Sequence, residues 1–179
     1  NGIIDVRMYV LIYHACGKEK TIEWVNDFIK TGIRGGLGNE HFRLGHVKIL
    51  IDGSTSGPSC AVSRPYEHDP ALEGIQLYTQ EEADAVLIPA HNAGFNITAH
   101  AVGDKAVDVI LSSIEKAQKL NPRPCRHRIE HCAIIDDEII DRLKKANVTV
   151  VSNPGFFIDN AAMYIKYYGD RVNCMFPLK

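Results

Sequence analysis

The sequence predicts an α/β fold built from parallel βα units, and we expect these units to belong to a (β/α)8 barrel. Stretches with strand-like and helix-like apolar periods alternate along the chain, and the unusual ionisable residues gather at the ends of predicted strands. Alternation of this kind leaves an open doubly wound sheet or a barrel. An open sheet would usually carry a glycine-rich phosphate turn after its first strand, and residues 13–17 (YHACG) do not match GxGxxG. The barrel is therefore preferred.

The first half of the chain supplies two predicted strands and two predicted helices. Residues 3–13 (IIDVRMYVLIY) are rich in β-branched and aromatic side chains and predict a strand. Residues 21–31 (TIEWVNDFIKT) predict a helix with Thr21 as its cap. A glycine-rich segment then leads to a second strand at residues 45–51 (GHVKILI). After a long loop, residues 79–92 begin with a capping threonine and acidic side chains, as the start of a helix requires.

The second half continues the alternation with three strands and two helices. Strands are predicted at residues 95–101, 125–132 and 147–152, and helices at residues 104–120 and 136–147. Five strands thus alternate with helices along the chain. This order argues for parallel strands joined by helical crossovers.

Size and composition limit the number of domains and the kinds of partner that can be expected. The 179 residues suit one domain but are short for a complete barrel of about 250 residues, so residues 1–179 are expected to form a single, incomplete barrel domain. A formal charge of -2 provides no long-range field for nucleic acid or an anionic membrane, and neither partner is expected. No stretch approaches the ~20 apolar residues of a membrane span. Five scattered cysteines without a CxxC pair indicate reduced thiols and a cytoplasmic protein.

Three predicted strands carry a lysine or a histidine among apolar neighbours. Lys48 lies within VKILI, His100 ends NITAH and His131 ends RIEH. The histidines are 31 residues apart (131 minus 100), which fits one βα repeat and would place both imidazoles on one rim of a barrel. Neutral imidazole is a common ligand of Zn²⁺ and similar metals, so the pair is a candidate metal site. His127 lies deeper along the same strand as His131 and is expected to be structural.

Lys48 has three interpretations. A lysine in a buried strand is costly unless it is neutral, paired or modified. Carbamylation by carbon dioxide would convert its amine into a carboxylate able to bridge two divalent metals. A Schiff-base or general-base role, as in a lysine-dependent aldolase, is the second interpretation. The third is an edge lysine whose ammonium group reaches solvent.

Residues near these strand ends supply further candidates. Asp104 stands at a predicted helix start, where it would cap the helix or orient a ligand histidine. The loop over residues 54–78 is far longer than a usual βα connection and is a candidate substrate wall. Within this loop, Arg64 and Tyr66 are candidate substrate contacts.

Several sequence blocks together resemble the amidohydrolase superfamily, specifically its YtcJ-like branch, which includes N-substituted formamide deformylases and exoenzyme regulatory proteins. The resemblance runs from about Arg43 to the end of the chain, with the blocks in order and at natural spacing. The blocks are VKILIDGSTSG (47–57), RPYEHDP (64–70), NITAHAVGDKAVD (96–108), RHRIEHC (126–132) and VSNPGFF (151–157).

The resemblance implies a partial (β/α)8 TIM barrel of the metal-dependent hydrolase type, roughly its strands 3 to 7 with their helices. It implies hydrolysis of an amide-type, non-peptide carbon–nitrogen bond in a small molecule by water that a divalent metal activates. The metal implied is zinc, as one or two ions. By position, His100 and His131 match metal ligands after the fifth and sixth barrel strands, and Lys48 matches a fourth-strand lysine that can be carbamylated. All three are therefore candidate catalytic residues.

Two features of the family have no counterpart in residues 1–179: the His-x-His pair of the first strand and the aspartate of the eighth. A site of two histidines and one lysine should bind metal weakly, and we expect residues 1–179 alone to be inactive. The open edges of an incomplete barrel favour a homo-oligomer. The alternative function is a non-catalytic regulatory or ligand-binding relative, similar to the exoenzyme regulators.

Overall fold

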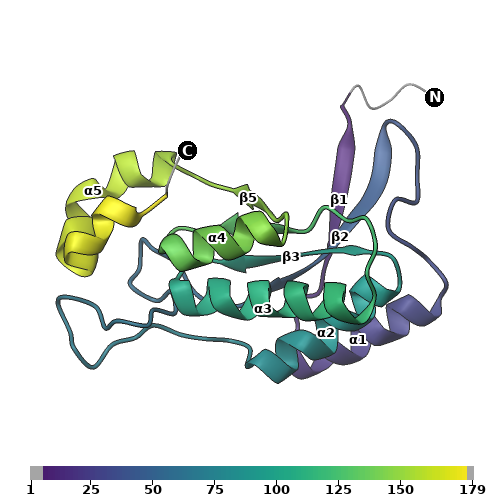
Figure 1. The fold of residues 1–179 in the computed structure, drawn as a ribbon, viewed down its shortest axis with the longest axis horizontal. Coiled ribbons are helices and arrows are strands. Elements are labelled where there is room, and N and C mark those ends of the chain that lie inside the picture. Colours follow the sequence, from purple (N-terminus) through teal and green to yellow (C-terminus); the bar gives the residue numbers. More distant parts are fainter. Residues whose placement is uncertain (1–5, 177–179) are drawn as a thin grey trace.

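The computed structural model describes residues 6–176, which form a five-stranded parallel sheet with helices against it (Figure 1). The strands are β1 (Met8–Tyr13), β2 (Phe42–Leu50), β3 (Asn96–Ala101), β4 (Arg128–His131) and β5 (Thr149–Val151). The connecting helices are α1 (Lys18–Lys30), α2 (Gln80–Asn92), α3 (Asp104–Leu120) and α4 (Asp137–Lys145). After β5 come α5 (Gly155–Tyr168) and the short 3-10 helix η1 (Gly169–Cys174).

The strand order β1-β2-β3-β4-β5 adds each new strand at the same edge of the sheet. A doubly wound sheet would reverse this direction at a switch point. Right-handed crossovers in a constant direction place the connecting helices on one face, which is how consecutive units of a β/α barrel are arranged. The predicted α/β class is therefore confirmed, with the strands in the order of a barrel segment.

The two faces of the sheet differ in chemistry. Val47, Ile49, Ile97 and Ile129 are fully buried and pack with α1, α2, α3 and α4 in the main core. Between these positions lie Lys48, Thr98 and Arg128, and the register pairs Lys48 with Thr98 and Thr98 with Arg128. Because paired residues of parallel strands point the same way, the face away from the helices is polar. In a barrel, this polar face is the interior.

Of the two threonine caps predicted from the sequence, the structure confirms one and corrects the other. At α2, the Thr79 hydroxyl accepts from the Glu82 backbone, and the Glu82 carboxylate accepts from the Thr79 N–H, so the predicted threonine cap is confirmed. At α1, the prediction of Thr21 as the cap is wrong. The helix begins at Lys18 after Gly17, and the buried Thr21 hydroxyl donates to the Gly17 carbonyl one turn back, at 2.7 Å.

Strand β4 is shorter than the prediction at residues 125–132. Ile97 of β3 donates its backbone N–H to Nδ1 of the His127 side chain at 3.0 Å, where a longer β4 would offer a backbone carbonyl. His127 is buried, and its Nε2 lies 3.1 Å from Nδ1 of His91 in α2. This residue is structural, as the sequence indicated.

Helix α5 and the loop between β2 and α2 form a second, smaller core at the carboxyl end of the sheet (Figure 1). Tyr164 and Tyr168 of α5 are fully buried there beside Cys60 and Tyr66 of the loop. The Thr55 and Tyr164 hydroxyl oxygens lie 2.8 Å apart, which ties the start of the loop to α5. The sequence predicted no helix after residue 152, so α5 and η1 are additions.

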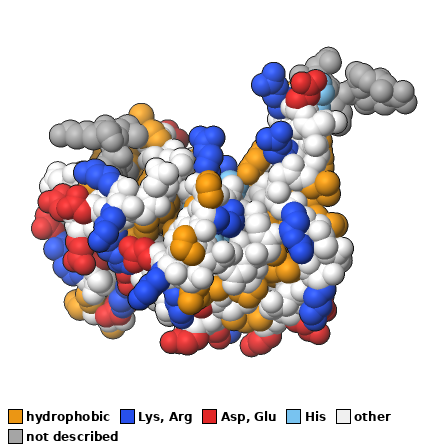
Figure 2. All heavy atoms as spheres, turned by 45° about the vertical axis from the view of Figure 1, so that its right-hand side comes forward, with side chains coloured by type: hydrophobic (Ala, Val, Ile, Leu, Met, Phe, Trp, Pro, Cys, Tyr) orange, Lys and Arg blue, Asp and Glu red, His pale blue; other side chains and the backbone are white. Residues whose placement is uncertain are grey.

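Strand β1 and the first part of β2 project from the body of the molecule, and hydrophobic side chains lie on their surface (Figure 2). Met8, Tyr9 and Phe42 are exposed on this projection. The start of the strand predicted at residues 3–13 lies outside the described residues.

All five cysteines are free thiols. Among residues 6–176, none of the helices combines the length and the apolar character that crossing a membrane would require.

Candidate metal centre

The carboxyl ends of β3 and β4 bring His100 and His131 together. Their ring centroids are 4.6 Å apart and the ring planes are inclined by 69°. The register pairs Ala101 with His131, one residue beyond the level of His100. The expectation that both imidazoles lie on one rim of the sheet is therefore met.

The backbone at His131 is bent into a tight turn that redirects its side chain. His131 has a φ of 73°, and the Cys132 N–H donates to the Glu130 carbonyl oxygen at 3.1 Å across it. This is a γ-turn with positive φ, a strained conformation for a residue with a Cβ. Strict alternation would send His131 to the helix-covered face with Ile129, whereas the turn places its ring beside His100. Strain of about 1–3 kcal/mol is characteristic of functional sites.

Each imidazole has one nitrogen held by an oxygen acceptor. Nε2 of His100 donates to the Gly53 carbonyl oxygen at 2.6 Å, and Nδ1 of His131 donates to Oδ1 of Asn153 at 2.7 Å. The other nitrogens, Nδ1 of His100 and Nε2 of His131, have no hydrogen-bond partner within residues 6–176. Metal-binding histidines usually donate their second N–H to an oxygen in this way, which fixes the tautomer and leaves a lone pair for the metal. The donor set therefore fits two nitrogen ligands.

The surroundings of both rings favour the neutral form. Burial lowers the pKa of His100, and the neighbouring charges of His131 and Lys48 lower it further, while the hydrogen bond to Gly53 opposes the shift. Burial is also the main cause that lowers the pKa of His131, and the charge of Lys48 adds to it. Neutral imidazole is the form that binds a metal. Lys48 is close enough for its charge to act on both rings.

Asp52 is the carboxylate that supports this site. It is buried two residues after the end of β2 and accepts hydrogen bonds from the backbone N–H groups of Ala61, Val102 and Gly103. Its Oδ1 lies 3.6 Å from Nε2 of His100. Burial raises the pKa of Asp52 to about 7, against the opposing effect of these three donors. The carboxylate ties the long loop to the end of β3 and so positions the Gly53 carbonyl against His100.

Lys48 lies on the polar face of β2, where the register places it between Tyr13 and Thr98. Its side chain is partly buried, and within the described part of the chain its ammonium group has no hydrogen-bond or ion-pair partner. The neighbouring carboxylate of Glu130 is already engaged, by Arg128 at 2.5 Å and by the Thr98 hydroxyl at 3.1 Å. Lys48 thus faces the histidine pair without a counter-ion in residues 6–176.

The other candidates from the sequence lie elsewhere. Tyr66 is buried in the second core, and its hydroxyl donates to the Cys60 carbonyl oxygen at 2.7 Å. Arg64 forms an ion pair with Asp170. Their roles as substrate contacts remain predictions, and both side chains already bind other parts of the chain.

Asp104 holds the loop, and among the described residues no hydrogen bond or ion pair joins it to His100. Its carboxylate accepts from the backbone N–H of Ser63 at 2.9 Å and from the Ser63 hydroxyl. The cap residue of α3 is Gly103, and Asp104 is the first residue of that helix. Of the two carboxylates, it is Asp52 that lies beside His100, with its Oδ1 3.6 Å from Nε2 of that ring.

A cavity of about 30 Å³ adjoins the two imidazoles. Its lining includes Ser54 and Thr55 from the long loop and Phe156 from α5. The Phe156 ring stacks on His131 with centroids 6.1 Å apart at 22°. Asn153 and Phe156 belong to VSNPGFF, one of the blocks that carry the family resemblance. The sequence alone indicated no role for either residue. Within residues 6–176, no group of three or more histidine, cysteine or acidic side chains could hold a metal ion.

Known proteins are similar to this chain in sequence and in fold. The Bacillus subtilis (strain 168) protein YtcJ is 28% identical over 144 residues, which cover 80% of this chain and 27% of that protein. The N-substituted formamide deformylase of Arthrobacter pascens is 26% identical over 129 residues, 72% of this chain and 23% of that protein. The chain therefore spans about a quarter of the length of these curated relatives.

The fold agrees with the sequence comparison. The crystal structure of an uncharacterized metal-dependent hydrolase from Pyrococcus furiosus superimposes with a TM-score of 0.78 at 25% identity, covering 98% of this chain and 34% of that one. A family model described as "Amidohydrolase family" matches residues 9–172. The parallel sheet, the histidine pair on its carboxyl rim and these matches lead to one conclusion: the chain belongs to the amidohydrolase family.

Proposed function

We propose that the protein carrying this chain is a metal-dependent hydrolase that cleaves an amide-type, non-peptide carbon–nitrogen bond of a small molecule. The observation that carries the proposal is the pair of imidazoles, each with one nitrogen held by an oxygen acceptor and the other without a hydrogen-bond partner among residues 6–176. Family membership supports hydrolysis, and the name of the Arthrobacter relative supports an N-substituted amide.

The residues that would hold the metal are His100, through Nδ1, and His131, through Nε2. We propose zinc, because Zn²⁺ accepts imidazole ligands readily, with one or two ions in the complete site. When bound, the metal polarises the substrate carbonyl and lowers the pKa of water towards ~7. Gly53 and Asn153 fix the tautomers, and Asp52 holds the Gly53 carbonyl in place.

We propose that Lys48 becomes a further ligand by carbamylation. Its uncharged amine adds to the carbon of carbon dioxide. A carbon–nitrogen bond forms while the electron pair of one carbon–oxygen π bond moves to oxygen, and the nitrogen releases a proton to water. The product is a carboxylate where the chain now places an ammonium group without a counter-ion among residues 6–176. A negative group facing two neutral imidazoles completes a donor set suited to divalent zinc.

Residues 1–179 by themselves are expected to be inactive. The described residues contribute two imidazoles and one lysine to the site. Within residues 6–176, no further histidine, cysteine or acidic side chain joins the two imidazoles to complete a group that could hold a metal ion. The remaining ligands and a general acid for the leaving amine would come from other strands of a closed (β/α)8 barrel. Metal-dependent amide hydrolysis by residues 1–179 alone would refute this expectation.

The exposed projection of β1 and β2 also supports self-association, in line with the predicted homo-oligomer. Met8, Tyr9 and Phe42 present apolar surface beside an edge strand, which tends to pair with another chain. Sedimentation of residues 1–179 should show dimers or larger species at high concentration. A stable monomer would count against this proposal.

The test of the function is hydrolysis of N-substituted formamides by the full-length protein, followed through release of the amine. Activity should disappear after treatment with a chelator and return with added Zn²⁺. Activity that survives complete metal removal would overturn the proposal. A metal-loaded protein that binds these amides without cleaving them would favour the regulatory or ligand-binding alternative.

A further inference from the structure

We propose that a basic cavity at the amino ends of β2, β3 and β4 binds a small molecule through a phosphate group. The cavity has a volume of about 430 Å³, within the range of about 300–1,000 Å³ typical of small-molecule sites. The described residues that line it include three arginines, Arg43, Arg123 and Arg126, and no aspartate or glutamate. We call it the arginine cavity. The proposal goes beyond the proposed function, because it assigns a second ligand site at the other end of the sheet.

The arginine cavity lies away from the candidate metal centre. Asn96, the first residue of β3, lines the cavity, whereas His100 lies four residues further along the same strand (100 minus 96). At a rise of ~3.3 Å per residue, about 13 Å of strand separates the two positions. A small ligand held by the arginines would therefore not be in contact with the histidine pair.

Arg123 contributes a partly buried charge without a counter-ion. Its Nε, Nη1 and Nη2 atoms donate to the backbone carbonyl oxygens of His91, Pro124 and Phe95, respectively. These acceptors are neutral, and no carboxylate within residues 6–176 forms an ion pair with Arg123. A guanidinium group has five N–H donors, so two remain for a ligand. Burial lowers the pKa of Arg123, and an anion beside it would favour the charged form again.

Arg43 and Arg126 supply two further charges. Both residues are exposed, and within the described part of the chain neither guanidinium group forms a hydrogen bond or an ion pair. Glu40 is the acidic residue nearest to Arg43 along the chain, and its carboxylate lies 3.5 Å from Nε2 of His41. A planar guanidinium group binds the oxygens of a phosphate or a carboxylate through two parallel hydrogen bonds. Both side chains are therefore available to an anion.

The charge of the arginine cavity favours a phosphate over a single carboxylate. Its three guanidinium groups carry three positive charges. A carboxylate supplies one negative charge, whereas a phosphate ester carries about −1.5 to −2 at pH 7 and offers three strong acceptor oxygens. The chain as a whole has a formal charge of -2, so the positive potential is local. Such a local potential suits a small anion and not a nucleic acid.

The walls of the arginine cavity are held in place by the fold. The Arg126 backbone N–H donates to Oδ1 of Asn96 at 3.1 Å, and its carbonyl oxygen accepts from Nε2 of the buried His46 at 2.8 Å. On another side of the cavity, the Gly36 N–H donates to the Leu44 carbonyl oxygen at 2.8 Å. Because the backbone is already fixed, binding has to order only the arginine side chains, which keeps its entropic cost small.

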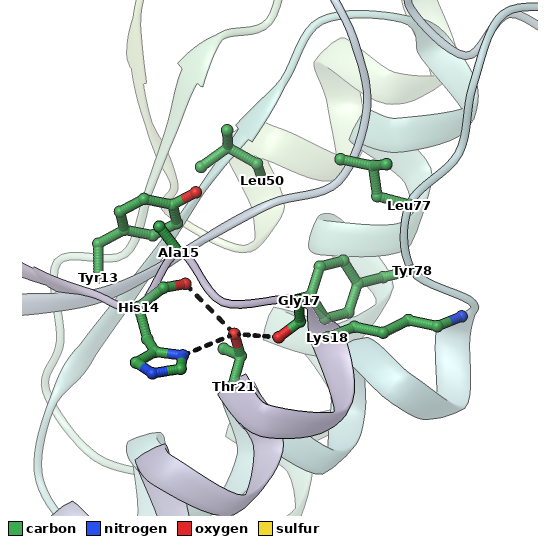
Figure 3. Close-up of a pocket in the computed structure, with 9 residues that line it drawn as sticks. All are labelled: Tyr13, His14, Ala15, Gly17, Lys18, Thr21, Leu50, Leu77 and Tyr78. Atoms are coloured by element: carbon green, nitrogen blue, oxygen red, sulfur yellow. Dashed lines mark hydrogen bonds between the residues drawn. The ribbon is translucent and has the colours of Figure 1, made fainter.

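The cavity at the carboxyl ends of β1 and β2, by contrast, has its cation already paired (Figure 3). Its volume is about 360 Å³, and Lys18 is the one lysine or arginine among the described residues that line it. The Lys18 ammonium group pairs with Glu82 at 2.7 Å, and in Figure 3 it extends away from Tyr13 and Leu50. The unpaired positive charges belong to the arginine cavity, and the phosphate site is assigned there.

The experiment is a calorimetric titration of the metal-loaded full-length protein with inorganic pyrophosphate. Wild type should bind it, and Arg43→Gln and Arg126→Gln should each weaken binding about tenfold or more, because each removes a charged donor. Both positions are exposed, so these variants should fold as wild type does. Lys166→Gln, at an exposed lysine of α5, removes one positive charge at the opposite end of the sheet and should bind as wild type does.

Pyrophosphate that does not bind, or that binds equally to wild type and both arginine variants, would overturn the proposal. His100→Ala should bind pyrophosphate as wild type does. Binding lost in His100→Ala but kept in the arginine variants would place the anion at the metal and would also overturn it. Because the readout is binding, this result does not depend on whether any amide is hydrolysed.

A second titration tests the chemical class of the ligand. Tricarballylate, a small anion with three carboxylates, should bind more weakly than pyrophosphate to wild type. Equal or tighter binding of tricarballylate that is weakened by Arg43→Gln and Arg126→Gln would overturn the assignment to a phosphate group.

Discussion

The His131 ring lies 4.6 Å from the His100 ring only because the backbone reverses its side-chain direction at the end of β4. By alternation, His131 shares the helix-covered face of β4 with Ile129, while His100 is on the polar face of β3. The γ-turn at His131 overrides that alternation at a cost in strain. Two imidazoles from neighbouring strands therefore share one site, and the following predictions concern what holds them and what they hold.

Asn153 is expected to position His131 for metal binding. Asn153→Ala removes the acceptor of the Nδ1 proton and should weaken metal affinity by about 10–100-fold. Asn153→Asp keeps an oxygen acceptor and should restore most of the affinity. Competition titration with a chromogenic chelator measures both. Asn160→Ala, at a partly exposed amide in α5, is the control, and equal affinities in all variants would show that Asn153 has no positioning role.

Lys48 is expected to carry a carbamate. Labelling the full-length protein with ¹³C-carbon dioxide should give a carbamate carbon signal in NMR that Lys48→Met removes and Lys144→Met, at an exposed lysine, leaves intact. Borohydride treatment with a carbonyl substrate should trap nothing on Lys48. A borohydride-stable adduct at this residue would instead support the Schiff-base interpretation of a lysine-dependent aldolase.

Tyr66 is expected to stabilise the loop core. Tyr66→Phe leaves the buried Cys60 carbonyl without its donor and should lower the free energy of unfolding by about 1–3 kcal/mol, with KM unchanged. Tyr9→Phe, at an exposed tyrosine, should leave both quantities near wild type. Chemical denaturation and steady-state kinetics provide the two measurements. A raised KM at normal stability would support the substrate contact predicted from the sequence.

His127 is expected to make stability dependent on acidity. Burial, followed by the charges of His91 and Arg123, lowers its pKa to about 3. The unfolded state, with a histidine pKa of about 6.5, then binds more protons between these values. Stability is therefore complete above about pH 6.5 and falls with decreasing pH towards about 3, by up to ~1.4 kcal/mol per pH unit.

The slope from His127 is measured by denaturation at a series of pH values. His127→Gln should have a shallower decrease between pH 6.5 and 4 than wild type, even if it is less stable overall. His41→Gln, at an exposed histidine, should reproduce the wild-type slope. Parallel curves for wild type and His127→Gln would contradict the prediction.

Local sequence was sufficient for much of the fold. The predicted helix at residues 104–120 agrees with α3, because an amphipathic period and a clear start coincide there. The cap assigned to Thr21 was wrong because a buried threonine hydroxyl bonds back along the helix as readily as it caps one. Helix α5 was missed because its buried tyrosines are specified by contacts with the long loop, which no local pattern reveals.

The site was only partly predictable for a similar reason. His100 and His131 could be found because their spacing equals one βα repeat. Asp52 and Asn153 could not be assigned, because each acts through a loop that the fold brings to the rim.

The most direct test of the metal centre is the metal content of the purified full-length protein by mass spectrometry, in wild type, His100→Ala and His41→Ala. Wild type and His41→Ala should contain at least one zinc or similar divalent ion per chain, and His100→Ala should contain much less. A His100→Ala protein that is folded and retains the full wild-type metal content would contradict the assignment of His100 and His131 as metal ligands.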